Sequence, residues 1–416
     1  MPNAGLKGLK SRAGFLAHAF YGRPSDSLWV CGVTGTNGKT SCAQWLAHVL
    51  SLKEIRTGVI GTLGSGFPGS LAPNPNTTPD ALELHQALSE MKSAGAAAVA
   101  MEVSSHGLDQ GRVNGVAFDC ALFTNLTHDH LDYHGTMAAY AEAKARLFDA
   151  PGLAAAVLNL DDPFGAQLAK RLAGRSVRTI GYGISSSGKS SGNTEEFICA
   201  FEPDADSIRI NSSWGEATVT FSQLGRFNVA NALGVLGCLV AKGIAFEEGA
   251  RLLATLPQVA GRMQQIGDRP LVVVDYAHTP DALDKVLSAL RPLAQARGGR
   301  LVAVFGAGGG RDQAKRPVMG RVASARADRV VLTSDNPRGE DPRAIVEAIR
   351  DGVSGDCVVE LDRTKAIDAA IGSAAAADVV LIAGKGHEGF QEIAGQRLPF
   401  SDAAAAGAAL GRRGIR

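Results

Sequence analysis

The sequence has few cysteines and no long apolar run, and each deficit excludes a class of protein. Its six cysteines among 416 residues are scattered, with no C-x-x-C spacing. This argues against a disulfide framework or a zinc site and suits a reducing cytosol. No apolar run approaches the roughly 20 residues of a membrane span, and the N-terminus lacks the apolar core of a secretory signal. We therefore expect a cytoplasmic protein without a membrane span.

An excess of charge is lacking as well. Lys and Arg number 42 and Asp and Glu 41, which gives a formal net charge of +1. No general attraction for nucleic acid or an anionic membrane is expected, so any anion site must be local. Glycine, in contrast, is abundant, with 50 residues, and 45% of the residues are hydrophobic. Length and composition together indicate a loop-rich α/β enzyme of two or three domains.

Apolar runs with the length of strands alternate with helical patterns between residues 28 and about 180. This alternation predicts a parallel sheet flanked by helices. After a polar Ser/Gly-rich loop at 185–196, three short runs predict antiparallel strands, and the alternation later restarts with four more buried strands. We expect an α/β fold with a central domain over 25–262, holding a parallel sheet plus a small antiparallel sheet. A C-terminal Rossmann-like α/β domain is expected over 263–416.

Two stretches compete as a phosphate-binding loop. Residues 183–190, "GISSSGKS", meet the pattern G-x-x-x-x-G-K-[ST], whereas 32–41, "GVTGTNGKTS", carry valine at its first glycine. Context favours 32–41, because a strand precedes it and an apolar-periodic helix follows, with its N-terminal end toward the phosphates. Lys39 would then contact the β- and γ-phosphates, and Thr40 or Ser41 would offer a hydroxyl to Mg²⁺. A glycine-rich turn with an exposed lysine is the alternative.

A partial dinucleotide fingerprint, "GAGGGRD" at 306–312, follows another apolar run. The third glycine of G-x-G-x-x-G would fall on Arg311. Since a lone partial match is weak, nicotinamide binding is disfavoured.

The form T-G-T-N-G-K-T resembles the phosphate loop of the Mur ligases and of their folylpolyglutamate synthetase relatives. Further stretches follow in the order found in that family, including "VVVDYAHTPDAL", "TSDNPRGEDPRAI" and "AGKGHEGFQ". All of them together are similar to the members that add the third residue of the peptidoglycan stem peptide. The matching stretches are 100–113, 123–148, 225–234, 260–263, 272–283, 308–320, 333–345 and 383–391.

This resemblance implies an ATP-dependent amide ligase of cytoplasmic peptidoglycan precursor synthesis. It would add meso-diaminopimelate to UDP-MurNAc-L-Ala-D-Glu through an acyl phosphate, with ATP and Mg²⁺ as cofactors. The expected partners are these small molecules alone, and a monomer is expected. Phosphoryl transfer to a carboxylate brings anions together, so the site needs cations and positioning more than covalent help.

Four residues are implied as magnesium ligands: Thr40, Glu102, His130 and Lys144. In the resembled family the lysine is carbamylated, so that its new carboxylate reaches the ion. Glu102 ends a buried run and His130 lies in a loop after another, where ligands converge on open α/β sheets. By pattern alone, Lys144 would be a solvated helix charge and Glu102 a salt-bridged strand terminus. The ring of His130 could simply hydrogen-bond to nearby carboxylates.

Nucleotide contacts are implied from two parts of the chain. Asn228 and Asn231 stand three apart at a predicted helix start, so both amides can face one ligand, near adenine in the family. Arg262 would reach the γ-phosphate and Asp275 the ribose hydroxyls. An N-capping asparagine and a linker salt bridge are the alternatives. The implied nucleotide set is Gly35, Thr36, Asn37, Gly38, Lys39, Thr40, Ser41, Asn228, Asn231, Arg262, Asp275 and His278.

The resemblance also implies a site for each of the two other substrates. The acceptor residues would be Asn76, Thr77, Thr78, Ser104, Gln110 and Arg112. Thr78 could equally cap a helix beginning near Pro79. The diaminopimelate residues would be Arg311, Asp335, Asn336, Pro337, Arg338, Gly384 and Glu388. Diaminopimelate has a second carboxylate that lysine lacks, and the guanidinium of Arg338 is its natural bidentate partner. Without the family match, Arg338 would be a surface charge after a proline.

Family members carry an N-terminal domain that holds the UDP moiety, whereas residues 1–24 here resemble only the end of that domain and its linker. A shortened chain, a wrongly assigned start or a natural short form would explain this. Two other functions stay open, namely a ligase of folylpolyglutamate synthetase type and an ATP-binding module without ligase activity.

Overall fold

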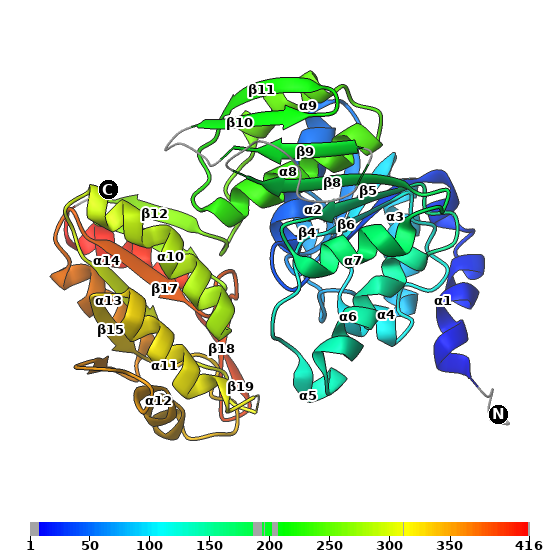
Figure 1. The fold of residues 1–416 in the computed structure, drawn as a ribbon. Helices are drawn as coiled ribbons and strands as arrows, with labels where there is room; N and C mark the ends of the chain where they lie inside the picture. Colours follow the sequence, from blue (N-terminus) through cyan, green and yellow to red (C-terminus); the bar gives the residue numbers. More distant parts are fainter. Residues whose placement is uncertain (1–7, 186–193, 195, 202–206, 311, 415–416) are drawn as a thin grey trace, which may run out of the picture. The chain divides into compact units, whose positions relative to one another are not determined.

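A computed structural model describes residues 8–185, 194, 196–201, 207–310 and 312–414. It divides into two compact units, which we treat separately (Figure 1). The first comprises 1–222 with 226–257, and the second comprises 223–225 with 258–416. No helix among the described residues is long and apolar enough to cross a bilayer.

One sheet runs through the first unit. Its strands are β1 (Trp29–Thr34), β2 (Thr57–Gly61), β3 (Gly64–Phe67), β4 (Ser70–Ala72), β5 (Ala98–Glu102), β6 (Cys120–Phe123), β7 (Ala155–Asn159), β8 (Arg178–Ile184), β9 (Glu196–Ala200), β10 (Ser207–Ser212) and β11 (Gly215–Thr220). The strand order is β11-β10-β9-β8-β7-β6-β1-β5-β2-β3-β4. The neighbours in the stretch β9-β8-β7-β6-β1-β5-β2 pair in parallel. The predicted antiparallel strands β9 to β11 are present. They extend the main sheet rather than forming a separate one, because β8 pairs with β9.

Helices cover this sheet. They are α1 (Leu9–Phe20), α2 (Lys39–Leu52), α3 (Ala81–Ser93), α4 (Ser105–Asp109), α5 (Leu131–His134), α6 (Met137–Ala145), α7 (Pro163–Leu172), α8 (Arg226–Ala241) and α9 (Phe246–Leu252), with 3₁₀ turns η1 (Pro24–Ser27), η2 (Arg146–Asp149) and η3 (Leu253–Thr255). Most of α8 is buried, because it packs against α2 as well as β6, β7 and β8. Its sequence accordingly has little polar surface, as expected of a helix covered on several sides.

The second unit repeats the α/β arrangement. Its strands are β12 (Gln264–Asp268), β13 (Leu271–Asp275), β14 (Leu301–Phe305), β15 (Arg329–Leu332), β16 (Val358–Val359), β17 (Val379–Ala383), β18 (Phe390–Ile393) and β19 (Gln396–Pro399). Its helices are α10 (Pro280–Ala296), α11 (Lys315–Arg326), α12 (Pro342–Arg350), α13 (Arg363–Ser373) and α14 (Asp402–Arg412). The main sheet has the order β12-β13-β17-β14-β15-β16, parallel except for β12. The four predicted strands are thus confirmed.

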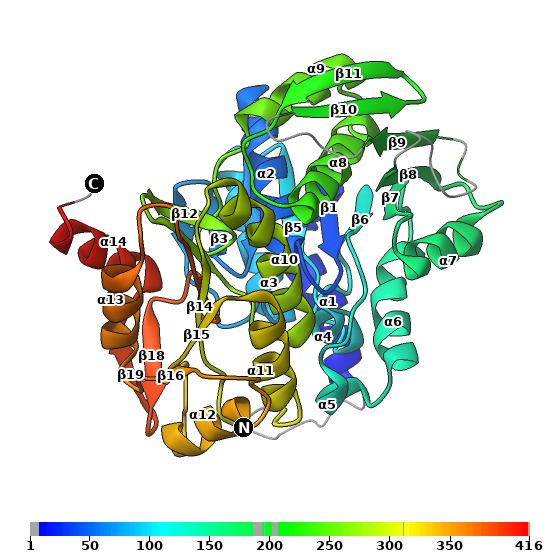
Figure 2. The same ribbon diagram turned by 60° about the vertical axis from the view of Figure 1, so that its left-hand side comes forward.

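Side-chain alternation divides the core of the second unit between the two faces of its sheet. Val272 and Val274 join residues of α13 and α14 in one apolar cluster, and Figure 2 shows these two helices side by side. The intervening residues, such as Val273, point to the opposite face. Because both faces are buried, the central strands β13, β14 and β17 read as continuous apolar runs, which is typical of parallel sheets.

Candidate active site

The predicted phosphate loop lies between β1 and α2, and its glycines have no room for side chains. A Cβ on Gly35 would lie 1.9 Å from Thr124 Oγ1, and one on Gly38 would lie 2.4 Å from Asn231 Oδ1. Their φ angles are +149° and +87°, which L side chains rarely adopt. Both positions therefore require glycine, for packing as well as for conformation.

The loop is also hydrogen-bonded to the segment that follows β6. The backbone N–H of Thr36 donates to Asn125 O at 2.8 Å, and that of Asn37 donates to Asn125 Oδ1 at 3.0 Å. The hydroxyl of Thr36 lies 3.1 Å from that of Tyr140. These contacts fix the loop's backbone beside the ends of two neighbouring parallel strands.

Two lysine amines converge on the carbonyl of Gly35. Lys39 Nζ donates to it at 2.9 Å and to Thr36 O at 2.8 Å, and Lys144 Nζ donates to it at 2.8 Å. Lys144 is 1% exposed, so the solvated charge suggested by its helical pattern alone is wrong. Burial, followed by the nearby charge of Lys39, holds the pKa of Lys144 well below its ordinary value. The amine of Lys144 is therefore readily uncharged.

Oxygen donors suited to Mg²⁺ gather at the end of β5. Thr40 Oγ1 donates to Glu102 Oε2 at 3.0 Å, and the hydroxyl of Thr62 donates to the same oxygen at 3.1 Å. The backbone N–H of Thr62 donates to Oε1 at 2.8 Å. Glu102 is 1% exposed, and the partners described here are hydroxyl and amide groups rather than the cation of a salt-bridged terminus. Hydroxyl and carboxylate oxygens side by side fit the preference of Mg²⁺ for hard ligands.

His130 stands just before α5 with a φ of +54°. Its Nε2 lies 3.4 Å from the carboxylate of Asp129. The structure therefore also contains the nearby carboxylate that the alternative interpretation of His130 requires. Partial burial, opposed by Asp129 and assisted by the nearby Lys39, lowers the pKa of His130 to about 4. The ring is therefore neutral near pH 7 and retains a lone pair for a metal ion.

The two predicted adenine-side asparagines lie together at the start of α8. Asn231 Nδ2 is 3.4 Å from Asn228 Oδ1, and both residues are buried. Because α8 begins at Arg226, Asn228 lies within its first turn, and the alternative that it caps the helix is wrong. The closeness of Asn231 to Gly38 places this pair beside the phosphate loop.

The predicted acceptor residue Thr78 is completely buried. Its hydroxyl donates to Glu102 O at 2.9 Å and accepts from Ser104 N at 2.9 Å. The cap of α3 is Asp80, whose carboxylate accepts from two backbone N–H groups of the first turn, so the alternative that Thr78 caps this helix is wrong. Thr78 instead links its own segment to the backbone of Glu102 and Ser104 through hydrogen bonds.

The other predicted acceptor residues occupy the same region. Arg112 donates to Gln110 Oε1 at 2.8 and 3.1 Å and to Thr78 O at 2.7 Å. Ser104 caps α4. The hydroxyl of Thr77 lies 3.0 Å from that of Thr62, and Asn76 is exposed.

In the second unit, Arg262 and His278 both contact Tyr276. The guanidinium of Arg262 lies 4.5 Å from the centre of the Tyr276 ring and donates to Gly261 O at 3.2 Å. His278 Nδ1 lies 2.9 Å from Tyr276 O. Cation–π contact and hydrogen bonding thus position two of the predicted nucleotide residues around one aromatic ring.

Asp275 ends β13 and is held by backbone groups. Its carboxylate accepts hydrogen bonds from the N–H groups of Met263 at 2.7 Å and Ala277 at 2.8 Å. Burial raises the pKa of Asp275, although the charge of Arg262 and these hydrogen bonds oppose the shift. The carboxylate is therefore rigidly placed at the carboxyl end of its strand.

The predicted diaminopimelate residues meet at the carboxyl ends of β15 and β17. Gly384 has a φ of +115°, and a Cβ there would lie 2.5 Å from Asp335 Oδ2. Asn336 Nδ2 donates to Glu388 Oε2 at 2.8 Å. Pro337 follows directly, and its carbonyl accepts from the backbone of the next turn. Asp335, Asn336, Gly384 and Glu388 therefore lie together in one cluster.

Arg338 is half-buried rather than a free surface charge. Its φ is +53°, its Nη1 donates to Gly309 O at 2.7 Å, and its Nε lies 3.6 Å from Glu392 Oε2. Its side chain is 30% exposed, so a ligand can reach the guanidinium. The companion residue Arg311 lies outside the described residues, as do residues 186–190 of the competing phosphate loop.

Sequence reasoning missed Lys385, which is central to this cluster. Its ammonium is completely buried, donates to Asn336 Oδ1 at 2.9 Å and to Glu388 Oε2 at 2.8 Å, and lies 4.0 Å from Asp335 Oδ1. Its position in "AGKGHE", between Gly384 and Glu388, was the available signal. Lysine in a glycine-rich loop is normally solvated, and only the fold reveals that this one is not.

Sequence reasoning also missed a buried ion pair that holds the backbone of this cluster. Arg363 and Asp402 form a completely buried bidentate ion pair, with distances of 2.7 and 2.8 Å. Arg363 also donates to Ser334 O at 3.2 Å and Ala383 O at 2.9 Å. These carbonyls directly precede Asp335 and Gly384, so the ion pair fixes the backbone that presents both residues.

Family models and curated relatives match most of this chain. The model described as "Mur ligase middle domain" matches residues 33–239, and that described as "Mur ligase, glutamate ligase domain" matches 261–386. A UDP-N-acetylmuramoyl-L-alanyl-D-glutamate--2,6-diaminopimelate ligase of Ralstonia nicotianae is 50% identical over 419 residues, covering 99% of this chain and 81% of that protein. The protein of the same name from Chromobacterium violaceum is 48% identical, covering 96% and 81%.

Solved structures are also similar to this chain. A structure of a protein with the same name is 37% identical, covers 100% of this chain and 86% of its own, and has a TM-score of 0.67. A folylpolyglutamate synthase of Mycobacterium tuberculosis, complexed with ADP and AMPPCP, is 19% identical with a TM-score of 0.68, covering 98% and 96%. The second likeness is one of fold alone. Both units of the chain, and nearly its whole length, are accounted for by these relatives, and the chain belongs to the Mur ligase family.

Proposed function

We infer that this protein is the ATP-dependent ligase that adds meso-diaminopimelate to UDP-MurNAc-L-Ala-D-Glu. The observation that carries this inference is 50% identity over 99% of the chain to a relative named for that activity. The cluster of Asp335, Asn336 and Glu388 around Lys385, with Arg338 two residues after Asn336, supports it, because it offers charges of both signs to an amino acid. We further propose that the protein acts as a monomer in the cytoplasm.

The reaction has two steps. An oxygen of the acceptor's glutamyl carboxylate attacks the γ-phosphorus of ATP, and ADP leaves with the electrons of the broken P–O bond. The amine of diaminopimelate then attacks the acyl carbon, phosphate leaves, and the amine loses a proton to give the amide. Lys39 and the N–H groups of the phosphate loop would hold the transferred phosphoryl group, which needs cations and fixed geometry.

We propose that Thr40, Glu102, His130 and carbamylated Lys144 hold Mg²⁺. The ion supplies positive charge beside the phosphates when it is bound. Glu102 and Thr40 are already in contact, His130 is neutral, and the buried amine of Lys144 donates to a carbonyl of the phosphate loop. An uncharged amine adds to CO₂ to give a carbamate and one proton, so the lowered pKa of Lys144 favours this modification.

Arg338 is proposed to select diaminopimelate over lysine. The guanidinium can pair with the carboxylate on the distal carbon of diaminopimelate, which lysine lacks. Leaving such a cation without its partner typically costs roughly 2–5 kcal/mol. Since about 1.4 kcal/mol corresponds to a factor of ten, discrimination of roughly a hundredfold is expected.

The test is an ADP-release assay with UDP-MurNAc-dipeptide and either diaminopimelate, lysine or no amino acid. We expect turnover with diaminopimelate, little with lysine, and a roughly hundredfold higher KM for diaminopimelate in Arg338→Ala. Arg343→Ala, an exposed arginine on α12, is the matched control and should behave as the unmodified protein. Equal use of lysine would refute the specificity. Turnover only with a folate substrate, or nucleotide binding without any turnover, would instead support the alternative functions.

A further inference from the structure

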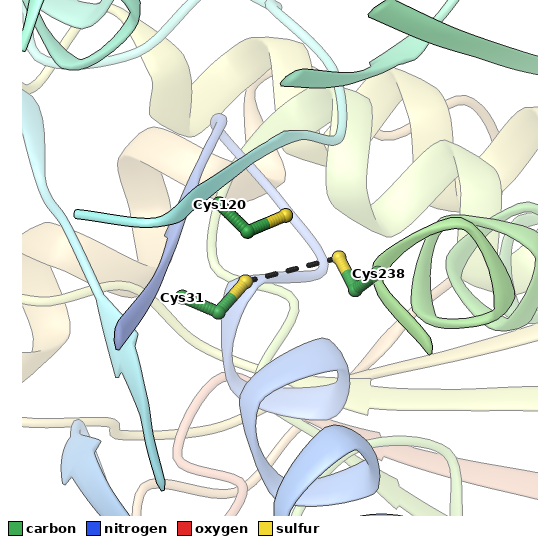
Figure 3. A group of neighbouring side chains, drawn as sticks. All are labelled: Cys31, Cys120 and Cys238. Atoms are coloured by element: carbon green, nitrogen blue, oxygen red, sulfur yellow. Dashed lines mark hydrogen bonds between the residues drawn. The ribbon is translucent and has the colours of Figure 1, made fainter. Parts of the chain in front are cut away.

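Three cysteines that are far apart in the sequence meet in the core of the first unit. Cys31 lies on β1 and Cys120 on β6, where they are direct partners in the parallel ladder. Cys238 comes from α8, which packs against β6. Figure 3 shows the three sulfur atoms turned toward one another. Because the three cysteines are widely spaced along the chain, they form no metal-binding motif that sequence analysis could detect.

The spacing of the sulfurs fits a single metal ion. Cys31 Sγ and Cys238 Sγ are 3.8 Å apart, and all three Sγ atoms lie within 4.8 Å of one another. Metal–thiolate bonds are about 2.3 Å long, so three sulfurs surrounding one ion in a plane are about 4 Å apart. An ion could therefore be seated with sulfur movements of well under about 1 Å.

We propose that Cys31, Cys120 and Cys238 form a site for one soft, monovalent metal ion of the Cu⁺ class. The donor set contains sulfur alone, and all three side chains are completely buried. Sulfur ligands select soft ions such as Cu⁺ and discriminate against Mg²⁺, which prefers oxygen. Among the described residues, no other group of three histidine, cysteine or carboxylate ligands is as tightly clustered.

The charge of the cluster favours a monovalent ion. All three side chains are completely buried, and a net charge is costly in an apolar core. A monovalent ion leaves the site neutral after one thiol loses its proton, whereas a divalent ion would need a second deprotonation. No electron is transferred, and any thiol proton that is displaced goes to solvent.

The elements that hold the cluster also lead into the nucleotide site. β1 continues into the phosphate loop, β6 into the segment that carries His130, and α8 begins with Asn228 and Asn231. An ion at this position would therefore tie together three elements that converge on one ligand. The alternative is that the three thiols act only as small apolar side chains, which is common for buried cysteine.

Metal binding by the whole chain tests the proposal without depending on ligase activity. The protein is incubated anaerobically with Cu⁺ and then with a Cu⁺ chelator as competitor, and retained copper is measured per chain. We expect one Cu⁺ per chain in the unmodified protein and in Cys357→Ser, whose thiol lies outside the cluster. Cys120→Ala should bind at least ten times more weakly. X-ray absorption should show sulfur neighbours alone.

Folding of the variant is checked by circular dichroism, and Cys120→Val replaces it if the alanine variant is unfolded. Complete loss of copper to the chelator by the unmodified protein would overturn the proposal. So would unchanged retention by a folded Cys120 variant, or loss of copper in Cys357→Ser. Uptake of Zn²⁺ in preference to Cu⁺ would refute the charge argument and with it the assignment to a monovalent ion.

Discussion

Replacing Lys385 with methionine should damage diaminopimelate binding far more than ATP binding. Methionine keeps much of the volume of the lysine but removes the ammonium that bridges Asn336 and Glu388. The carboxylates of Glu388 and Asp335 are then left without their buried cation. Breaking a buried ion pair by removing one partner typically costs 3–5 kcal/mol.

The expected magnitude lies at the lower end of that range, because the side chain of Glu388 is 22% exposed and water can compensate part of the loss. A cost of about 3 kcal/mol corresponds to roughly a hundredfold change in an equilibrium constant. We therefore expect the KM for diaminopimelate to rise roughly a hundredfold, while the KM for ATP changes less than about twofold, since its predicted ligands do not contact Lys385.

The matched control is Lys365→Met on α13, whose side chain is 73% exposed and whose ammonium lies 3.8 Å from Asp362. Exposed ion pairs of this kind contribute about 0–1 kcal/mol, so this variant should retain its kinetics. A double-mutant cycle with Glu388→Gln measures the coupling, and the two losses should not add. If Lys385→Met lowers only the melting temperature and leaves the KM for diaminopimelate unchanged, Lys385 does not position the substrate and the reasoning fails.

Three further predictions concern other lysines and a histidine. Lys39→Ala should lower ADP formation at least about a hundredfold through the lost phosphate contact, whereas Lys189→Ala of the competing loop should be nearly silent; equal losses would contradict the loop assignment. Lys144→Ala should lose most ligase activity and regain part of it with added small carboxylates, and full activity without them would exclude the carbamate. Burial, followed by nearby cations, lowers the pKa of His387 to about 3 from an ordinary 6.5, so the folded state binds fewer protons and stability is lost as the pH falls below 6.5. In urea titrations, His387→Gln should therefore lose about 1 kcal/mol less unfolding free energy than the unmodified protein between pH 7 and pH 5.5; identical pH profiles would disprove this.

Local patterns were sufficient wherever the chain itself supplies the geometry. Central strands of both sheets, such as β5, β7, β13 and β14, were predictable because each is a short apolar run buried on both faces. The phosphate loop was predicted at 32–41 from its neighbours rather than from an exact match to the consensus, and the strand β1 and the helix α2 do flank it. Such a strand and helix aim backbone N–H groups at phosphates. The alternative that Thr78 caps α3 is wrong for a related reason. Asp80 lies nearer to the helix and accepts two backbone hydrogen bonds there.

Features that depend on burial could not be predicted in the same way. Lys144 and Lys385 sit in segments where a lysine is usually solvated, and only the packing of other elements over them removes their water. The clustering of Cys31, Cys120 and Cys238 likewise depends on two strands and a helix from distant parts of the chain. Family resemblance supplied a role for Lys144 but none for Lys385, which the fold alone reveals.

The ion pair of Arg363 and Asp402 sets a lower limit on the length of an active chain. The family match ends at residue 386 and the last predicted site residue is Glu388, so a chain trimmed after 391 would retain every residue assigned a role in chemistry. It would nevertheless lose α14 and leave the guanidinium of Arg363 buried without its carboxylate, at a cost of about 3–5 kcal/mol. The guanidinium of Arg363 would no longer be held where it donates to the carbonyls of Ser334 and Ala383. The backbone that presents Asp335 and Gly384 would then be less ordered. The C-terminal helix therefore stabilises the amino-acid pocket, although none of its residues is among those predicted to contact a substrate.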